Sequence, residues 1–409
     1  MTTPLPDVPE PAETRAETPE TPEPPKVQDP PKASRSPDGQ EIPDSLQDEL
    51  RAVFGEFTGV PERTPLVHNP RNGATAGVWR VRVGERSAVL KVLTRSKATE
   101  AGWAASEDPR HWNYWRREAE VYESGLARVW QPAGLRGPRL LAAVERPDGD
   151  VALWLEDAPG EPATGWPLDR HAEFARRLGA AQGAARVTDR PWLSRCFLRD
   201  YIGAKTLGAE LLDEDAAWRQ PLVRDHFPRG LREEMVRLRQ DREWFLGVLE
   251  ALPRAFCHLD LWPANVVGAG PDAVLLDWSF AGDGALGEDL GNYVPDSVFD
   301  LFLPAARLPG YAAAAYDAYL HGLREAGWRG DEAQVRLAVC ASAVKYDWLT
   351  GLMLARAGER QLDYGGGRTV SAGLRYRERG LALSFLADWA REARTLAPRL
   401  GFPEAPSGR

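Results

Sequence analysis

One stretch of the chain combines residue types that could bind a metal ion and a phosphate group. His258, Asp260 and Asn265 follow one another in the pattern His-x-Asp-x-x-x-x-Asn, and twelve residues later an apolar run ends at Asp277. Carboxylate and amide oxygens are ligands that Mg²⁺ takes together with the phosphates of a substrate. Phosphoryl transfer depends on positioning and charge stabilisation, which two rigid loops with such ligands could provide. The pattern alone leaves a second interpretation open, an ordinary polar loop between two strands.

A lysine in an upstream strand could contact the same phosphates. Lysine is scarce in this chain, with 6 residues against 45 arginines, at positions 26, 32, 91, 97, 205 and 345. A lone lysine in a strand often only extends its charged end to solvent. Against so many arginines, however, Lys91 in the apolar run 89–93 needs a specific reason. Glu118, Glu120 and Glu123 follow in a helical segment and could pair with Lys91 or form a solvated helix face.

The elements that must position these residues change in character along the chain. Strand patterns come first, at 64–68, 77–83, 87–93, 139–145 and 150–155, with turns at Asn72-Gly73 and Gly84-Glu85. Helical spacing occurs at 46–54, at 112–126 and from 168 onward, most clearly in the apolar stripe 231–252. A short strand pair is expected within 255–278, followed by long helices to about residue 398. The order predicts a small sheet-rich part followed by a larger helical part.

Together these motifs resemble the aminoglycoside phosphotransferase and choline kinase family, over roughly residues 45–398. The resemblance implies the protein-kinase-like bilobal fold, which is α+β with a small antiparallel-sheet N-lobe and a larger, mainly helical C-lobe. We therefore expect a nucleotide-binding lobe at 43–157, a catalytic and acceptor-binding lobe at 158–400 and a flexible tail at 401–409. Residues 1–42 contain eleven prolines and few large apolar side chains, which predicts a disordered leader.

The resemblance also implies roles for the catalytic and metal-binding residues. Asp260 would accept or orient the hydroxyl of the acceptor, while Asn265 and Asp277 would bind Mg²⁺. His258 would pack beneath the loop as a structural residue. Asp289, in Gly287-Glu288-Asp289-Leu290, would brace the catalytic loop, and a helix N-cap is a compatible alternative.

Further residues would bind the nucleotide, ATP or GTP. Lys91 would contact its α- and β-phosphates, and Glu118 would pair with Lys91. The backbone around Glu156 and Ala158 would pair with the base. The segment 72–77 occupies the place of the hairpin that covers the phosphates, but it lacks Gly-x-Gly-x-x-Gly, so its phosphate contacts stay unassigned.

Departures from protein kinases favour a small-molecule acceptor. Trp262 stands where protein kinases have a lysine, Asp277-Trp278-Ser279 replaces Asp-Phe-Gly, and no Ala-Pro-Glu follows. Trp262 could form a wall of the acceptor pocket or belong to the core. Candidates to face the acceptor, or to lie on the surface, are Asp296, Asp300, Tyr346, Asp347 and Trp348. A catalytically silent nucleotide-binding module and, more remotely, a protein kinase are the alternatives.

Composition narrows the acceptor, the partners and the location. The segment 401–409 contains one acidic residue, which weakens an antibiotic-resistance function for a chain that resembles aminoglycoside kinases. The net charge of −9 includes no basic surplus, which argues against nucleic acid as a partner. Three separated cysteines exclude a disulfide framework. Without a signal peptide or an apolar run long enough to cross a membrane, we expect a cytoplasmic protein.

Overall fold

The computed structural model describes residues 44–406 except 100, 186–188 and 359–369. The predicted leader (1–42) and the last three residues of the predicted tail lie outside the described residues. The described chain begins with helix α1 (Asp44–Phe54), which ends at Gly55 as the sequence predicts. Its Glu49 carboxylate is buried and accepts hydrogen bonds from Arg146 Nε (2.8 Å) and Trp154 Nε1 (2.8 Å), which fixes the helix to the first sheet.

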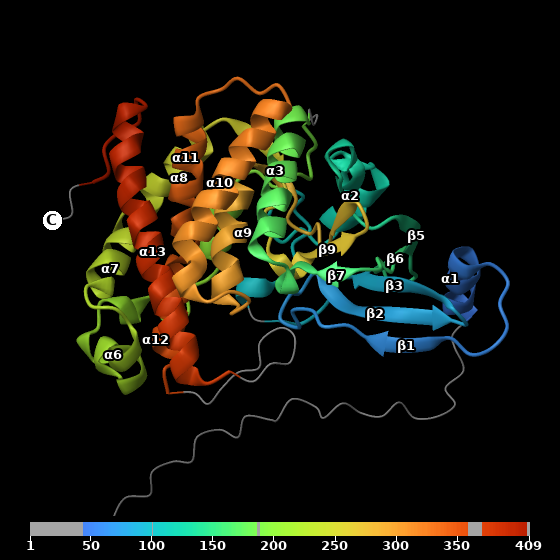
Figure 1. Cartoon of the computed structure of the whole chain (residues 1–409). Helices are drawn as coiled ribbons and strands as arrows, with labels where there is room; N and C mark the ends of the chain where they lie inside the picture. The colour runs from blue at the N-terminus through green and yellow to red at the C-terminus, as the bar shows by residue number, and fades with distance from the viewer. Residues whose placement is uncertain (1–43, 100, 186–188, 359–369, 407–409) are drawn as a thin grey trace, which may run out of the picture. The chain divides into compact units, whose positions relative to one another are not determined.

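The first sheet is antiparallel, with the strand order β1-β2-β3-β6-β5 (Figure 1). Its strands are β1 (Glu62–Pro65), β2 (Thr75–Val83), β3 (Arg86–Leu93), β5 (Leu140–Glu145) and β6 (Val151–Glu156). Four of them match the predicted ranges within two residues at either end. The first strand was predicted at 64–68 and lies at 62–65 instead, because all of its side chains are exposed and no burial pattern marks its register.

Helix α2 (Arg117–Glu123) is shorter than the predicted helix 112–126. The Arg117 guanidinium draws the preceding segment into a tight loop by donating to the carbonyls of Trp112 (2.8 Å), Pro109 (3.0 Å) and His111 (2.7 Å). At the other end, Gly125 has φ +77°, a left-handed conformation that ends the helix.

The remainder is mainly helical, and small sheets carry the polar loops. The small sheets contain β4 (Leu135–Arg136), β7 (Glu161–Pro162), β9 (Val266–Ala269) and β10 (Asp272–Leu275), and separately β8 (Arg254–Cys257) with β11 (Gly282–Ala285). The helices are α3 (Leu168–Ala184), α4 (Phe197–Gly203), α5 (Asp215–Arg219), α6 (Pro221–His226), α7 (Leu231–Gln240), α8 (Arg242–Ala251), α9 (Glu288–Phe299), α10 (Leu308–Glu325), α11 (Glu332–Ala341), α12 (Asp347–Ala355) and α13 (Ala372–Arg399). This arrangement is the predicted α+β fold class, which is confirmed.

The apolar stripe 231–252 forms two helices, α7 and α8, rather than one. Asp241 separates them, and its buried carboxylate accepts a hydrogen bond from Arg394 Nε of α13 (2.7 Å). The apolar stripe predicts which helix face is buried. It does not predict the break at Asp241, whose partner Arg394 lies 153 residues later in the chain.

Helices α3 and α10 lie side by side and touch backbone to backbone (Figure 1). A Cβ on Gly322 would lie 1.8 Å from the carbonyl oxygen of Arg176, and a Cβ on Gly179 would lie 2.0 Å from that of Tyr319. This close packing builds the core behind the catalytic segment. From Gln47 onward the chain clusters as one compact unit, so the predicted lobe boundary at 157/158 stays a prediction.

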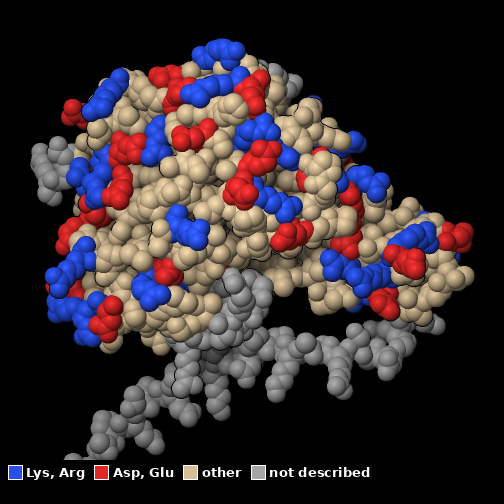
Figure 2. Space-filling view, in the orientation of Figure 1, with Lys and Arg blue, Asp and Glu red and all other residues tan. Residues whose placement is uncertain are grey.

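One described helical stretch, Glu332–Ala355, has the length and apolar composition to cross a membrane, but 89% of its most apolar 18-residue window is buried in the fold. It is therefore explained as core packing. Figure 2 shows acidic and basic side chains interspersed over one face of the molecule. The described chain also has exposed ion pairs, such as Arg95 NH1 with Glu107 Oε1 (2.6 Å), which contribute little stability individually.

Candidate active site

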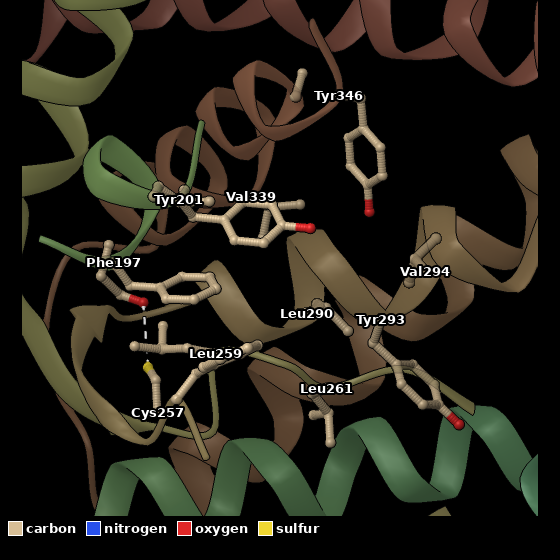
Figure 3. Close-up of a cluster of buried hydrophobic side chains, with 14 of the residues drawn as sticks. Phe197, Tyr201, Cys257, Leu259, Leu261, Leu290, Tyr293, Val294, Val339 and Tyr346 are labelled. Atoms are coloured by element: carbon tan, nitrogen blue, oxygen red, sulfur yellow. Dashed lines mark hydrogen bonds between the residues drawn. The ribbon is translucent and has the colours of Figure 1, made fainter. Parts of the chain in front are cut away.

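The predicted catalytic loop begins where β8 ends and is anchored by its leucines. Leu259 and Leu261 are both buried, and Figure 3 shows them within an apolar cluster that includes Leu290 and Tyr293 of α9. Asp260, between them, is only half-buried. Leu259 has φ +66°, a left-handed conformation that costs a non-glycine residue about 1–3 kcal/mol. Such a conformation persists only where surrounding contacts enforce it.

Helix α9 supplies those contacts on both sides of Asp260. The buried carboxylate of Asp289 accepts hydrogen bonds from the backbone amides of His258 (2.8 Å) and Leu259 (2.8 Å). One helical turn later, the Asn292 side-chain amide donates to the carbonyl of Leu261 (2.8 Å). The residues before and after Asp260 are therefore held from the same helix.

His258 connects the catalytic loop to the loop that carries Asp277. Its Nε2 donates to the carbonyl of Leu276 (2.9 Å), so Nδ1 accepts from the amide of Asp260 (3.3 Å). Burial is the main cause that lowers the pKa of His258 to about 4, and the ring is neutral at physiological pH. His258 thus links the two loops by hydrogen bonds, and its role as a structural residue stays a prediction.

Asp260 and Asn265 lie in direct contact. The Asn265 Nδ2 donates to the backbone carbonyl (3.0 Å) and to Oδ2 (3.2 Å) of Asp260, which leaves the Asn265 amide oxygen free of Asp260. Burial, followed by the negative charge of Asp277, raises the pKa of Asp260 to about 7. A carboxylate with a pKa near the working pH is suited to accepting a proton from a hydroxyl.

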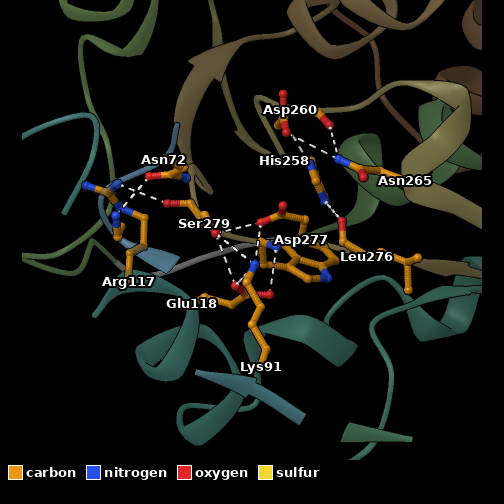
Figure 4. A network of polar contacts seen from close by, with 12 residues as sticks. Asn72, Lys91, Arg117, Glu118, His258, Asp260, Asn265, Leu276, Asp277 and Ser279 are labelled. Atoms are coloured by element: carbon orange, nitrogen blue, oxygen red, sulfur yellow. Dashed lines mark hydrogen bonds and ion pairs between the residues drawn. The ribbon is translucent and has the colours of Figure 1, made fainter. Parts of the chain in front are cut away.

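Lys91 of β3 and Glu118 of α2 meet at Asp277 (Figure 4). Lys91 Nζ forms an ion pair with Glu118 and lies 2.8 Å from Asp277 Oδ1. Ser279 Oγ is 2.6 Å from Asp277 Oδ1 and 3.1 Å from Glu118 Oε2. Of the three glutamates in the predicted helix, Glu118 is the one that reaches Lys91, while Glu120 lies 3.6 Å from Arg116.

Asp277 remains available to a cation despite this network. Burial opposes its ionisation, but the charge and hydrogen bond of Lys91, helped by Ser279, lower the pKa of Asp277 to about 2. Its side chain is 43% exposed, and Oδ2 has no hydrogen-bond partner among the described residues. The backbone at Asp277 is left-handed, with φ +59°, which is typical of strained functional positions.

These donors fit Mg²⁺. Oδ2 of Asp277 and the amide oxygen of Asn265 are hard oxygen ligands of the kind that Mg²⁺ uses alongside substrate phosphates. Within the described ranges, no group of three or more His, Cys, Asp or Glu side chains could hold a metal by itself. Asp277 and Asn265 would therefore hold such an ion only together with further ligands.

Glu156 and Ala158 lie at the end of the same sheet. Glu156 pairs with Ala88 of β3, three residue pairs from Lys91 and so about 10 Å along the strand. Its carboxylate accepts from Arg136 NH1 (2.8 Å) and from the amide of Arg139 (3.0 Å), so only its backbone could face a base. Ala158 follows directly after β6.

The candidate acceptor residues divide into two groups. Asp296 Oδ1 accepts from the Tyr346 hydroxyl (2.9 Å). Asp300 directly follows the last residue of α9, and burial raises its pKa to about 7. Asp347 instead is buried and paired with Arg242 Nε of α8 (2.6 Å), so it is a structural residue and not an acceptor contact.

The aromatic candidates pack against other aromatic rings. Trp348 packs edge-on against Tyr201 of α4, with ring centroids 6.2 Å apart. Trp262 is half-buried and stacks on Phe302 at 6.1 Å.

Motif reading missed two residues that support the catalytic loop. Lys345 is buried and binds the Asn292 side-chain oxygen, with its Nζ 3.3 Å from Asp296 Oδ2. By occupying the oxygen of Asn292, Lys345 orients the amide group toward Leu261. The scarcity of lysine could have signalled Lys345, whereas nothing in the sequence marks Asn292.

The chain belongs to the phosphotransferase enzyme family (APH), whose sequence model matches residues 67–332. Among solved structures, it is similar to an amicoumacin kinase in complex with AMP-PNP, Ca²⁺ and Ami, at 13% identity and a TM-score of 0.50, covering 85% of this chain and 94% of that one. This likeness supports the kinase-like fold.

Two further structures are similar at lower TM-scores. A choline/ethanolamine kinase family protein from Mesorhizobium loti has 17% identity and a TM-score of 0.47, over 86% of this chain and 98% of that one. The microcompartment-associated aminopropanol kinase has 14% identity and a TM-score of 0.49, over 85% and 98%. No curated protein matches the chain.

Proposed function

We propose that this protein transfers the γ-phosphoryl group of ATP or GTP to a hydroxyl group of a small molecule. The observation that carries the proposal is the meeting of the Lys91–Glu118 pair with Asp277, next to a catalytic loop that holds Asp260 and Asn265. The chain also belongs to a family of phosphotransferases, and this membership supports the proposal.

The side chains divide the work between nucleotide and acceptor. Lys91 binds the α- and β-phosphates, and Glu118 keeps its ammonium group in place. Asp277 and Asn265 would hold Mg²⁺, which when bound would offset the charge on the phosphate oxygens. Asp260 orients the acceptor hydroxyl and accepts its proton, while His258 and Asp289 keep the loop in position.

The acceptor is proposed to be an amino alcohol, an aminoglycoside-like compound or another sugar. Asp296 of α9 and Asp300, which directly follows that helix, could bind an amino group. Tyr201 and Trp348 add aromatic faces, which attract cations. An acceptor that carries an amine near its hydroxyl fits these residues best.

The nucleotide half of the proposal is tested by thermal unfolding with ATP and Mg²⁺. ATP with Mg²⁺ should raise the unfolding temperature of the native protein, and Asp277→Ala should abolish the increase because the metal loses its carboxylate ligand. Asp225→Ala is the matched control, since Asp225 is an exposed acid paired with the adjacent Arg224 (2.7 Å).

The acceptor half is tested by turnover over a library of aminoglycosides, amino alcohols, sugars and nucleosides. Asp260→Ala should retain metal-dependent ATP binding and lose phosphoryl transfer. A native protein without metal-dependent ATP binding would support the alternative of a silent module and refute the enzyme. Transfer that survives in Asp260→Ala would remove Asp260 from the mechanism.

A further inference from the structure

Lys205, just after α4, has its ammonium group enclosed by aromatic rings. Its Nζ lies 3.1 Å from the ring centroid of Trp103 and 4.7 Å from those of Trp112 and Tyr201. It also donates to the backbone carbonyl of Gly102 (2.8 Å), and the residue is only 9% exposed. Such a cage binds a cation more strongly than a single exposed ring does, because little water competes.

The cage joins two segments that are far apart in sequence. Trp103 and Trp112 belong to the connection between β3 and α2, whereas Tyr201 and Lys205 belong to α4 and the turn after it. Between them the backbones touch, since a Cβ on Gly102 would lie 2.5 Å from the carbonyl oxygen of Ala204. Lys205 therefore fastens the β3–α2 connection to the helical part of the protein.

The same connection holds the hairpin loop between β1 and β2. The Gly73 amide donates to the Trp103 carbonyl (2.9 Å), and a Cβ on Gly73 would lie 2.8 Å from that oxygen. Lys97 adds hydrogen bonds to the carbonyls of Asn72 (3.1 Å) and Thr75 (2.9 Å). This loop occupies the place where the proposed function requires a cover over the nucleotide phosphates.

The loop is thus linked by direct contacts to Lys205. The ammonium group holds the Trp103 ring and the Gly102 carbonyl, and the carbonyl of Trp103 holds Gly73. Tyr201 extends the chain of contacts to Trp348, one of the candidate acceptor residues. Nothing in the motif analysis uses Lys205, although it is one of four lysines in the described part of a chain that favours arginine.

We propose that Lys205 is a positioning residue for nucleotide binding, which anchors the hairpin loop over the phosphates through Trp103. The proposal rests on the proposed function for the identity of the ligand. The anchoring itself is a property of the protein without nucleotide, so the two can be tested separately.

The test compares Lys205→Met, which removes the charge but keeps the length, with Lys205→Arg, which keeps the charge. Arg170→Met is the control, because Arg170 also lies over a ring (Trp166, 4.2 Å) but its guanidinium bonds to Glu161 (2.9 Å), outside the hairpin loop. Trp103→Phe is a milder variant that retains a weaker ring for the cation. All four are measured by deuterium exchange without nucleotide and by calorimetric titration with AMP-PNP and Mg²⁺.

Lys205→Met should accelerate exchange at 66–76 and weaken AMP-PNP binding by about tenfold, the scale of a desolvated cation–π contact. Trp103→Phe should change both in the same direction by less, Lys205→Arg should restore most of the binding, and Arg170→Met should change neither. A purely structural role would lower the unfolding temperature without selective exchange at 66–76.

Unchanged exchange at 66–76 in both Lys205→Met and Trp103→Phe would overturn the proposal, as would equal binding by the Met and Arg variants. If the native protein does not bind AMP-PNP with Mg²⁺, the proposed function fails. The exchange data would in that case still decide whether Lys205 anchors the loop.

Discussion

Replacing Asp289 by asparagine removes a charge and one acceptor oxygen from beneath the catalytic loop. The carboxylate is fully buried and accepts from the amides of His258 and Leu259 and from Gln182 Nε2 (2.9 Å). Burial raises the pKa of Asp289 to about 6, so it is largely ionised at pH 7.5. Asparagine keeps one acceptor oxygen, and at least one of the three donors must lose its partner.

The structure sets the size of the effect. A buried donor without a partner costs about 1–3 kcal/mol, and the new amide group would also point at an N–H donor. We expect the free energy of unfolding to fall by about 2–4 kcal/mol. Leu259 would then relax from its left-handed conformation and shift Asp260, and a displacement near 1 Å lowers turnover by about 100-fold. Nucleotide binding should change less, because Lys91 lies on a different element.

Urea unfolding at pH 7.5 and turnover with the acceptor from the screen measure these effects. Glu288→Gln is the matched control, because Glu288 is a buried neighbour whose carboxylate accepts only from the amide of Ala285 (2.8 Å) among the contacts described. Glutamine can keep that bond, so the control should stay within about 1 kcal/mol of the native protein. The reasoning is refuted if Asp289→Asn is no less stable than Glu288→Gln, or if it retains full turnover.

Three further predictions concern pH, packing and a buried ion pair. Burial lowers the pKa of His171 to about 4 in the folded protein, so between pH 6.5 and 4 the unfolded chain binds more protons and stability decreases as the pH decreases. In urea unfolding at pH 7.5 and 5, His171→Gln should remove about 2 kcal/mol of this loss. An unchanged pH dependence in the variant would contradict the prediction. In the same measurement, Gly322→Ala should destabilise the protein by about 3 kcal/mol, because the added Cβ separates α3 from α10. Its control, Gly247→Ala, has open space at the Cβ and should stabilise α8 by about 0.5–1 kcal/mol. Equal effects of the two substitutions would exclude the close contact as the cause. Lys345→Met should lower the free energy of unfolding by about 3 kcal/mol, because Asp296 loses its cationic partner. Adding Asp296→Asn should recover part of that stability. Strictly additive losses in urea unfolding would show that the two side chains do not interact.

Local sequence patterns predicted much of the fold. Alternation in 77–93 and in 139–155 marked four strands of the sheet, and the spacing around Leu231 marked buried helix faces. These patterns work because burial on one side imposes a period of two on strands and about 3.6 on helices. The exposed strand β1 and the segment 112–116 were misplaced, since the first has no buried face and the second is shaped by Arg117.

The sequence also placed the candidate site residues on loops, and their roles stay predictions. Motif spacing placed Asp260, Asn265 and Asp277 on loops that the structure brings together with Lys91. Sequence patterns did not distinguish Asp347, which pairs with Arg242, from Asp296 near the site, because each is an acidic residue in an apolar helix. The structural role of Asp347 follows from a neighbour 105 residues earlier in the chain.

By itself the sequence determined the fold class and the polar loops, because these depend on residue type and short-range spacing. The tertiary structure decided which of three glutamates meets Lys91, and that Asn292 and Lys345 support the catalytic loop. It also decided that Lys205 lies in an aromatic cage. These partners lie up to 103 residues apart, and they meet only when packed elements bring their side chains within a few ångströms.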